Sequence, residues 1–170
     1  LLTALAGGGT VTFSCSGTII LTAEIVIAAD TTIDGSGQDV TISGNHAVRV
    51  FNVAFQVTLN LNRLTVANGN SGGGYGGGIN SSGTVIVSNS TFSGNSATGY
   101  GGGIYSFGTM EVSNSTFSGN SAFYGGGIVN YYGYGIVSNS IFSGNNATYG
   151  GVIANAGNAA TLTVSNSTFS

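Results

Sequence analysis

Hydrophobic and polar residues alternate in short segments along most of this chain. The clearest segments are 84–87, Thr-Val-Ile-Val, and 91–93, Thr-Phe-Ser, and similar segments return further along. Alternation with a period of two is typical of β-strands that bury one face. The apolar end of the phrase at 76–79, Gly-Gly-Gly-Ile, supplies a third segment. Each repeat is therefore expected to contain three short strands and three turns.

Two phrases recur with the same period. The phenylalanines of the phrase Ser-Thr-Phe-Ser and its variants are separated by 25, 25 and 27 residues, at Phe92, Phe117, Phe142 and Phe169. The isoleucines that follow the glycines are separated by 25, 24 and 25 residues, at Ile79, Ile104, Ile128 and Ile153. A shared period of this length predicts a solenoid in which each repeat forms one coil.

Aligning the repeats predicts which positions face the interior. One inward column contains Val85, Met110, Gly135 and Leu162, and a second contains Val87, Val112, Val137 and Val164. The position between them is occupied by Ile86, Glu111, Ile136 and Thr163, and this variety indicates an outward position. We predict an all-β fold: a single-stranded, right-handed parallel β-helix (β-solenoid) with three short strands per coil of about 25 residues and about six to seven coils.

The whole chain, residues 1–170, is expected to form a single solenoid domain. Residues 1–70 are irregular N-terminal coils, and residues 71–170 are the regular repeats. An apolar cap is expected over the first coil at residues 1–5, with no comparable cap at the other end, because end coils expose apolar ladders and unpaired backbone groups.

Two sets of aligned residues stand out at the turns. Asparagines at the bend between two strands predict a left-handed backbone and a ladder of stacked amides, at Asn89, Asn114, Asn139 and Asn166, with a second row at Asn95, Asn120 and Asn145. A tyrosine directly precedes each glycine phrase, at Tyr75, Tyr100, Tyr124 and Tyr149. These tyrosines are expected to project outward as a surface-contact stripe, either to bind a partner or to cover the glycine backbone.

Composition excludes several classes of protein. Only 4% of residues are charged, and two arginines with a net charge of -3 do not provide the basic face of a nucleic-acid binder. No apolar run has the length of a membrane span. Cys15 is the single cysteine, so no disulfide forms within the chain. Hydrophobic residues make up 41% of the chain and recur in blocks, which argues against disorder.

The repeats resemble those of polymorphic outer-membrane autotransporter passengers and related secreted bacterial surface proteins. The matching residues are Gly-Gly-Ile at 77–79, 102–104 and 126–128 and Phe-x-x-Asn at 92–95, 117–120 and 142–145. The third glycine of each Gly-Gly-Gly-Ile phrase, at 78, 103 and 127, stands where that family often has alanine. The resemblance implies a right-handed β-helix in an exported, extracellular or surface-attached adhesive or structural protein.

Many β-helices act on polysaccharides, so an enzyme is the alternative. Such chemistry needs paired carboxylates, or calcium-binding acids with a basic residue. The candidates are confined almost entirely to residues 24–63: Glu24, Asp30, Asp34, Asp39, His46, Arg49 and Arg63. Each has a simpler interpretation as a turn residue or an ion pair. We therefore expect no catalytic residue, no cofactor and no metal ion.

The favoured hypothesis is a non-enzymatic extracellular or cell-surface solenoid, structural or adhesive. It would be a fibre subunit that stacks head to tail on its own copies, or a segment of a long adhesin. Two alternatives stay open: a polysaccharide lyase or hydrolase with a site in residues 24–63, and a carbohydrate-binding surface on the tyrosine stripe that contacts cell-surface or matrix glycans. Asn80 and Asn146 are candidate glycosylation sites, since both start Asn-x-Ser/Thr sequons. No nucleic-acid partner is expected.

Overall fold

The computed structural model describes residue 5 and residues 7–170 of the chain. The predicted apolar cap, except for Leu5, therefore lies outside the described residues. Leu5 itself is buried, and its carbonyl oxygen accepts a hydrogen bond from the backbone N–H of Gly8 at 3.2 Å.

The chain forms a parallel β-solenoid of about 6 turns. Sheet A consists of β1 (Gly9–Thr12), β4 (Thr31–Asp34), β7 (Thr58–Asn62), β10 (Thr84–Ser88), β13 (Thr109–Ser113), β17 (Tyr134–Ser138) and β21 (Thr161–Ser165). Sheet B consists of β2 (Gly17–Ile20), β5 (Val40–Ser43), β8 (Thr65–Ala67), β11 (Thr91–Ser93), β14 (Thr116–Ser118), β18 (Ile141–Ser143) and β22 (Thr168–Phe169).

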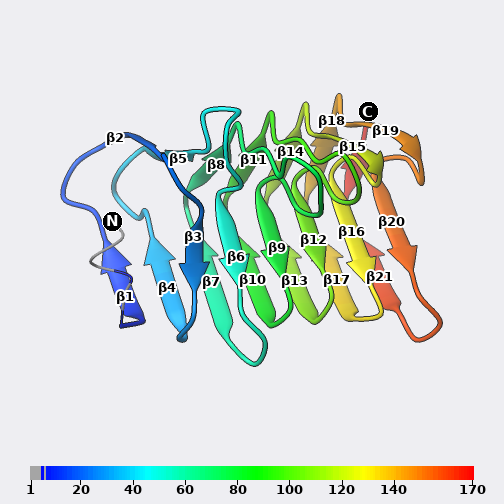
Figure 1. Ribbon diagram of the computed structural model, residues 1–170, viewed down its shortest axis with the longest axis horizontal. Coiled ribbons are helices and arrows are strands. Elements are labelled where there is room, and N and C mark those ends of the chain that lie inside the picture. The colour runs from blue at the N-terminus through cyan, green and yellow to red at the C-terminus, as the bar shows by residue number, and fades with distance from the viewer. Residues whose placement is uncertain (1–4, 6) are drawn as a thin grey trace.

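Sheet C consists of β3 (Ile25–Ile27), β6 (Phe51–Val53), β9 (Ile79–Ser81), β12 (Ile104–Ser106), β16 (Ile128–Tyr131) and β20 (Ile153–Ala156). A short sheet D pairs β15 (Ser121–Tyr124) with β19 (Asn146–Tyr149). Each full coil passes through sheets C, A and B in turn, and the coils follow one another along the long axis of the molecule (Figure 1). The predicted all-β parallel β-helix is confirmed.

The register of sheet A matches the predicted inward columns. Val85 of β10 pairs with Met110 of β13, which pairs with Gly135 of β17. Glu111, at the predicted outward position between the columns, is exposed. The N-terminal coils, although irregular in sequence, contribute strands β1 to β8 to the same sheets. Sequence irregularity in these coils is therefore accommodated in their loops.

Phenylalanine rings stack on one another through the core beneath sheet B. The ring centroids of Phe92 and Phe117 lie 4.8 Å apart, and those of Phe117 and Phe142 lie 4.9 Å apart. All three side chains have 0% exposure. Burial of like residues in line removes apolar area from water and gains stacking contacts.

The glycine phrase places three glycines at one corner for three different reasons. Gly101 has a φ of 66°, a left-handed conformation that favours glycine. A Cβ on Gly102 would lie 2.4 Å from the carbonyl oxygen of Gly126, so two coils touch through their backbones there. A Cβ on Gly103 would lie 2.6 Å from the carbonyl oxygen of Gly127 and 3.0 Å from the ring of Phe117, so this glycine is packed against both the next coil and the core.

Candidate functional site

The predicted tyrosine stripe is a column of rings in contact, stacked at Tyr100, Tyr124 and Tyr149 and tilted between Tyr75 and Tyr100. Ring centroids lie 5.5 Å apart between Tyr75 and Tyr100, 4.8 Å between Tyr100 and Tyr124, and 5.3 Å between Tyr124 and Tyr149. Tyr75 and Tyr149 are exposed at 47% and 54%, and the two middle rings are half-buried. We call these residues the Tyr column.

Backbone pairing holds the Tyr column in register. The carbonyl oxygen of Tyr100 accepts from the N–H of Gly76 at 2.9 Å, and that of Tyr124 accepts from the N–H of Gly101 at 2.9 Å. The same backbone positions form parallel bridges from coil to coil. The glycine after each tyrosine therefore fixes the ring above its counterpart in the next coil.

Further aromatic rings extend the Tyr column across the outer side of sheet C. Tyr105 stacks on Tyr75 with centroids 4.7 Å apart and contacts Tyr131 at 5.9 Å. Together with the Tyr column, the rings in this contact network are Tyr105, Phe107, Phe123, Tyr131 and Tyr132. We call the whole network the aromatic surface. The sequence did not predict these five rings, since only Phe107 and Tyr132 are separated by the repeat length of 25 residues and no aromatic row runs through all the coils at these positions.

Tyr132 belongs to the aromatic surface although its backbone is unfavourable. Its φ of 62° lies in the left-handed region, which costs a bulky side chain about 1–2 kcal/mol. The coil containing Tyr132 has one more residue at this turn than the coil before, because Ser106 pairs with Asn130 while Thr109 pairs with Tyr134. Its N–H donates to the carbonyl oxygen of Ala156 at 2.9 Å. Residues with strained backbone conformations cluster at active and ligand-binding sites, and the strained Tyr132 also has an exposed ring.

Two phenols of the aromatic surface, those of Tyr105 and Tyr131, have raised pKa values. Burial raises the pKa of Tyr105 to about 12, with smaller contributions from Tyr75 and Tyr131. The pKa of Tyr131 is also raised, chiefly by the neighbouring phenol of Tyr132. The phenols of Tyr105 and Tyr131 therefore act as uncharged hydroxyl donors.

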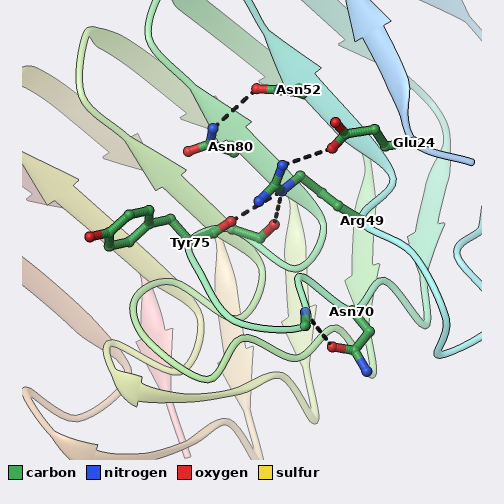
Figure 2. Close-up of polar contacts among 8 residues, drawn as sticks. Glu24, Arg49, Asn52, Asn70, Tyr75 and Asn80 are labelled. Atoms are coloured by element: carbon green, nitrogen blue, oxygen red, sulfur yellow. Dashed lines mark hydrogen bonds and ion pairs between the residues drawn. The ribbon is translucent and has the colours of Figure 1, made fainter.

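The nearest basic group is occupied by structural bonds. Arg49 forms an ion pair with Glu24 at 2.7 Å and donates through Nε to the carbonyl oxygens of Tyr75 and Gly76 at 3.1 and 3.0 Å (Figure 2). The Tyr75 ring points away from this guanidinium. Arg49 thus supports the first turn of the Tyr column and presents no free positive charge to a ligand.

The asparagine rows have different roles from those expected. Asn89, Asn114, Asn139 and Asn166 have the predicted left-handed backbone, with φ of 49–50°, but their side chains are exposed. Among residues 7–170 no hydrogen bond joins these amides to one another. The amide ladder runs instead through the second row, where Asn95 donates to Asn120 at 2.9 Å and Asn120 to Asn145 at 2.8 Å. The left-handed bend turns the first row towards solvent, so the inward row forms the bonds.

Serines next to the exposed asparagines form a second polar ladder. Ser115 Oγ donates to the carbonyl oxygen of Ser113 at 2.7 Å and accepts from the N–H of Ser90 at 3.1 Å. The same pattern links Ser115 to Ser140 and Ser140 to Ser167. These hydroxyls satisfy buried backbone groups at the corner where sheet A turns into sheet B.

The candidate glycosylation sites lie in different surroundings. Asn80 is half-buried on β9, and its amide donates to Oδ1 of Asn52 at 3.1 Å (Figure 2). Asn146 is exposed at the start of β19. Asn146 is therefore the more accessible acceptor.

The acids of residues 24–63 are engaged in local structure. Asp30 accepts from the N–H of Thr58 at 2.8 Å. Asp34 accepts from the hydroxyl and the N–H of Ser36 and from Asn62, and these bonds, led by the Ser36 hydroxyl, lower its pKa. His46 is exposed at a turn with a φ of 56°.

A hollow of about 410 Å³ lies over sheet B beside Asp39 and Arg63. Threonines at matching positions of β5, β8 and β11, Thr41, Thr65 and Thr91, line part of it. Among the described residues that line it, Asp39 is the one carboxylate. A glycosidase mechanism needs two carboxylates about 5–10 Å apart, so this hollow lacks the acid pair.

In the part of the chain that the structure describes, no three His, Cys, Asp or Glu side chains cluster as metal ligands. Nor do residues 5 and 7–170 contain a helix long and apolar enough to span a membrane. The chain matches no protein-family model, no curated protein and no solved structure.

Proposed function

We propose that this protein is a non-enzymatic extracellular β-solenoid with a structural or adhesive role, and that it binds neutral glycans through the aromatic surface. The observation that carries the proposal is the network of aromatic rings over sheets C and D, in which every ring except that of Tyr105 is exposed or half-buried. An aromatic surface of this kind, on a scaffold with few charges, is typical of a contact site.

The geometry of the rings favours particular contacts. Within the Tyr column the faces of the middle rings cover one another, with interplanar angles of 11° and 28° at Tyr124. Open ring area is therefore concentrated on exposed members such as Phe123 and Tyr132, at 43% and 44%. Aromatic faces bind the apolar side of sugar rings, and the phenol hydroxyls and nearby amides such as Asn80 supply hydrogen bonds.

Charge supports neutral glycans over acidic ones. The chain has two basic residues and a net charge of -3, and Arg49 is paired with Glu24. An acidic polysaccharide would approach a surface with no available counter-charge.

The resemblance of the repeats to autotransporter passengers supports an extracellular or cell-surface location. The fibre-subunit and adhesin-segment versions of this role share the same coils. Low charge and exposed rings also favour self-association.

Co-sedimentation with insoluble polysaccharides tests the proposal. Neutral polysaccharides are expected to retain the protein, whereas acidic ones, with or without Ca²⁺, are expected to leave it in solution. Reducing ends and unsaturated products are measured in the same tubes, and their release would support the alternative enzyme in residues 24–63 and contradict a non-enzymatic role. Sedimentation velocity without glycan separates self-association from glycan binding. Absence of retention on every neutral polysaccharide would overturn the glycan-binding proposal.

A further inference from the structure

The Tyr column brings phenol rings of neighbouring coils into contact. Within the Tyr column, Tyr100 and Tyr124 are the closest pair, with centroids 4.8 Å apart and an interplanar angle of 11°. Their backbones form a parallel bridge, so the two rings stay adjacent while the coils remain folded. Each phenol is therefore at an effective concentration of about millimolar or more relative to the other.

The surroundings make these tyrosines the main oxidisable groups. The chain contains no tryptophan, and its one methionine, Met110, has 0% exposure. Cys15 is a free, exposed cysteine near the other end of the solenoid. Tyr75 and Tyr149 are exposed at the two ends of the Tyr column, which lets an oxidant in solution reach it.

We propose that the Tyr column is a site of oxidative cross-linking, in which a peroxidase with hydrogen peroxide joins Tyr100 to Tyr124 as dityrosine. The product is a covalent staple between two successive coils on the outer side of the solenoid. This modification is independent of glycan binding.

The reaction balances with peroxide as the oxidant. Each phenol gives one electron to the peroxidase and its hydroxyl proton to water, which leaves a phenoxyl radical. The two unpaired electrons form a carbon–carbon bond between Cε atoms ortho to the hydroxyls. The hydrogen on each Cε then leaves as a proton, and each oxygen regains a proton. Overall, the two tyrosines lose two electrons and two protons, and one hydrogen peroxide becomes two waters.

Tyr134 provides a matched control. Its exposure of 50% is close to that of Tyr149, but among residues 7–170 no aromatic ring packs against it. It is open to the same oxidant and lacks an adjacent phenol. If exposure to the oxidant alone decided the product, Tyr134 would be cross-linked as readily as Tyr149. If an adjacent phenol is required, Tyr134 forms no cross-link within the molecule.

The test treats the full chain, in a Cys15→Ser background, with a haem peroxidase and hydrogen peroxide at several micromolar concentrations. Dityrosine fluorescence and peptide mapping are measured. We expect a monomer that has lost two hydrogens and a cross-linked peptide pair containing Tyr100 and Tyr124. At micromolar protein, coupling within one molecule should exceed coupling between molecules by about a thousandfold, so the rate per molecule should not depend on concentration.

Substitution by phenylalanine keeps the stacking and removes the phenol. The double variant Tyr100→Phe, Tyr124→Phe leaves no adjacent tyrosines in the Tyr column and should lose the cross-linked peptide, whereas Tyr134→Phe should match the parent. Three results would overturn the proposal: no dityrosine, cross-links only between molecules at a rate that rises with concentration, or an equal loss in the Tyr134→Phe variant.

Discussion

The side-chain amide of Asn120 donates to Oδ1 of Asn145 at 2.8 Å and to the carbonyl oxygen of Phe92 at 3.0 Å. Its own Oδ1 accepts from the backbone N–H of Asn95 at 3.0 Å and from the amide of the same residue at 2.9 Å. Asn120 has 0% exposure. Its hydrogen bonds therefore take the place of water in joining three successive coils.

Asn120→Ala is expected to lower the free energy of unfolding by about 3 kcal/mol, because it leaves buried donors and acceptors on both neighbouring coils without partners. Urea denaturation followed by circular dichroism measures the loss. Asn114→Gly is the matched control, since Asn114 is exposed with a φ of 49° that glycine adopts freely. The control should stay within about 0.5 kcal/mol of the parent. Equal losses in the two variants would contradict the assignment of the ladder to the inward row.

Glycines in packed and in open positions should respond differently to the same substitution. Gly102→Ala would place its Cβ 2.4 Å from the carbonyl oxygen of Gly126, whereas a Cβ on Gly73 would meet nothing within 4 Å. Since the backbone of the next coil yields little, Gly102→Ala should cost about 3 kcal/mol or more, and Gly73→Ala should stay within about 0.5 kcal/mol of the parent. Thermal unfolding of the two variants gives the comparison. Gly77→Ala in the previous coil should be destabilised like Gly102→Ala, and equal stability of the Gly73→Ala and Gly102→Ala variants would refute the packing explanation.

Stability should fall at alkaline pH through Tyr105. Its pKa in the folded protein is about 12, raised mainly by burial, against about 10 in an unfolded chain. A raised pKa means that the folded state favours the protonated phenol. The contribution of Tyr105 to the free energy of unfolding is therefore fully present below pH about 10 and is lost as the pH rises from about 10 to about 12. Tyr105→Phe should unfold at higher pH than the parent, and an unchanged alkaline midpoint would count against this role.

Removing Arg49 should destabilise the protein more than removing its ion-pair partner, Glu24. Glu24→Gln removes a partly exposed charge and is expected to cost at most about 1 kcal/mol. Arg49→Met also leaves the carbonyl oxygens of Tyr75 and Gly76 without their donor and should cost about 1–3 kcal/mol. Urea midpoints at low and high salt separate the two effects, because only the charge contribution is screened. A larger loss in Glu24→Gln would show that charge, and not the carbonyl contacts, dominates.

The coil interior could be predicted from sequence because its positions repeat. The column through Val85, Met110 and Gly135 follows directly from the period, and so do the stacked Phe92 and Phe117 rings. Because successive coils stack on one another, residues that are one repeat apart in the sequence lie at equivalent positions in neighbouring coils.

Periodicity alone could not decide which asparagine row forms the ladder. Asn89 and Asn95 recur with the same spacing in the regular repeats, and they differ in the direction in which the corner turns each side chain. A left-handed residue followed by a buried serine, as at Asn89 and Ser90, is a local signal that the asparagine points outward.

Only the Tyr column of the aromatic surface could be predicted from the sequence. The Tyr column repeats, but Tyr105, Tyr131 and Tyr132 occur once each and are joined to it only by pairing between coils. The acids near the N-terminus show no period at all, so their separate local roles could be established only from the structure.

The proposed binding of neutral glycans by the aromatic surface depends on its exposed rings. The decisive measurement is the affinity of the double variant Tyr149→Ala, Phe123→Ala for a neutral polysaccharide that retains the parent, measured by isothermal titration calorimetry beside Tyr134→Ala. The ring centroids of Tyr149 and Phe123 lie 5.1 Å apart at the exposed edge of the aromatic surface. Tyr134 has a similar exposure and lies outside the aromatic surface. We expect the double variant to bind about tenfold or more weakly than the parent and Tyr134→Ala to bind like the parent. Unchanged affinity in the double variant, with its fold intact by circular dichroism, would contradict it.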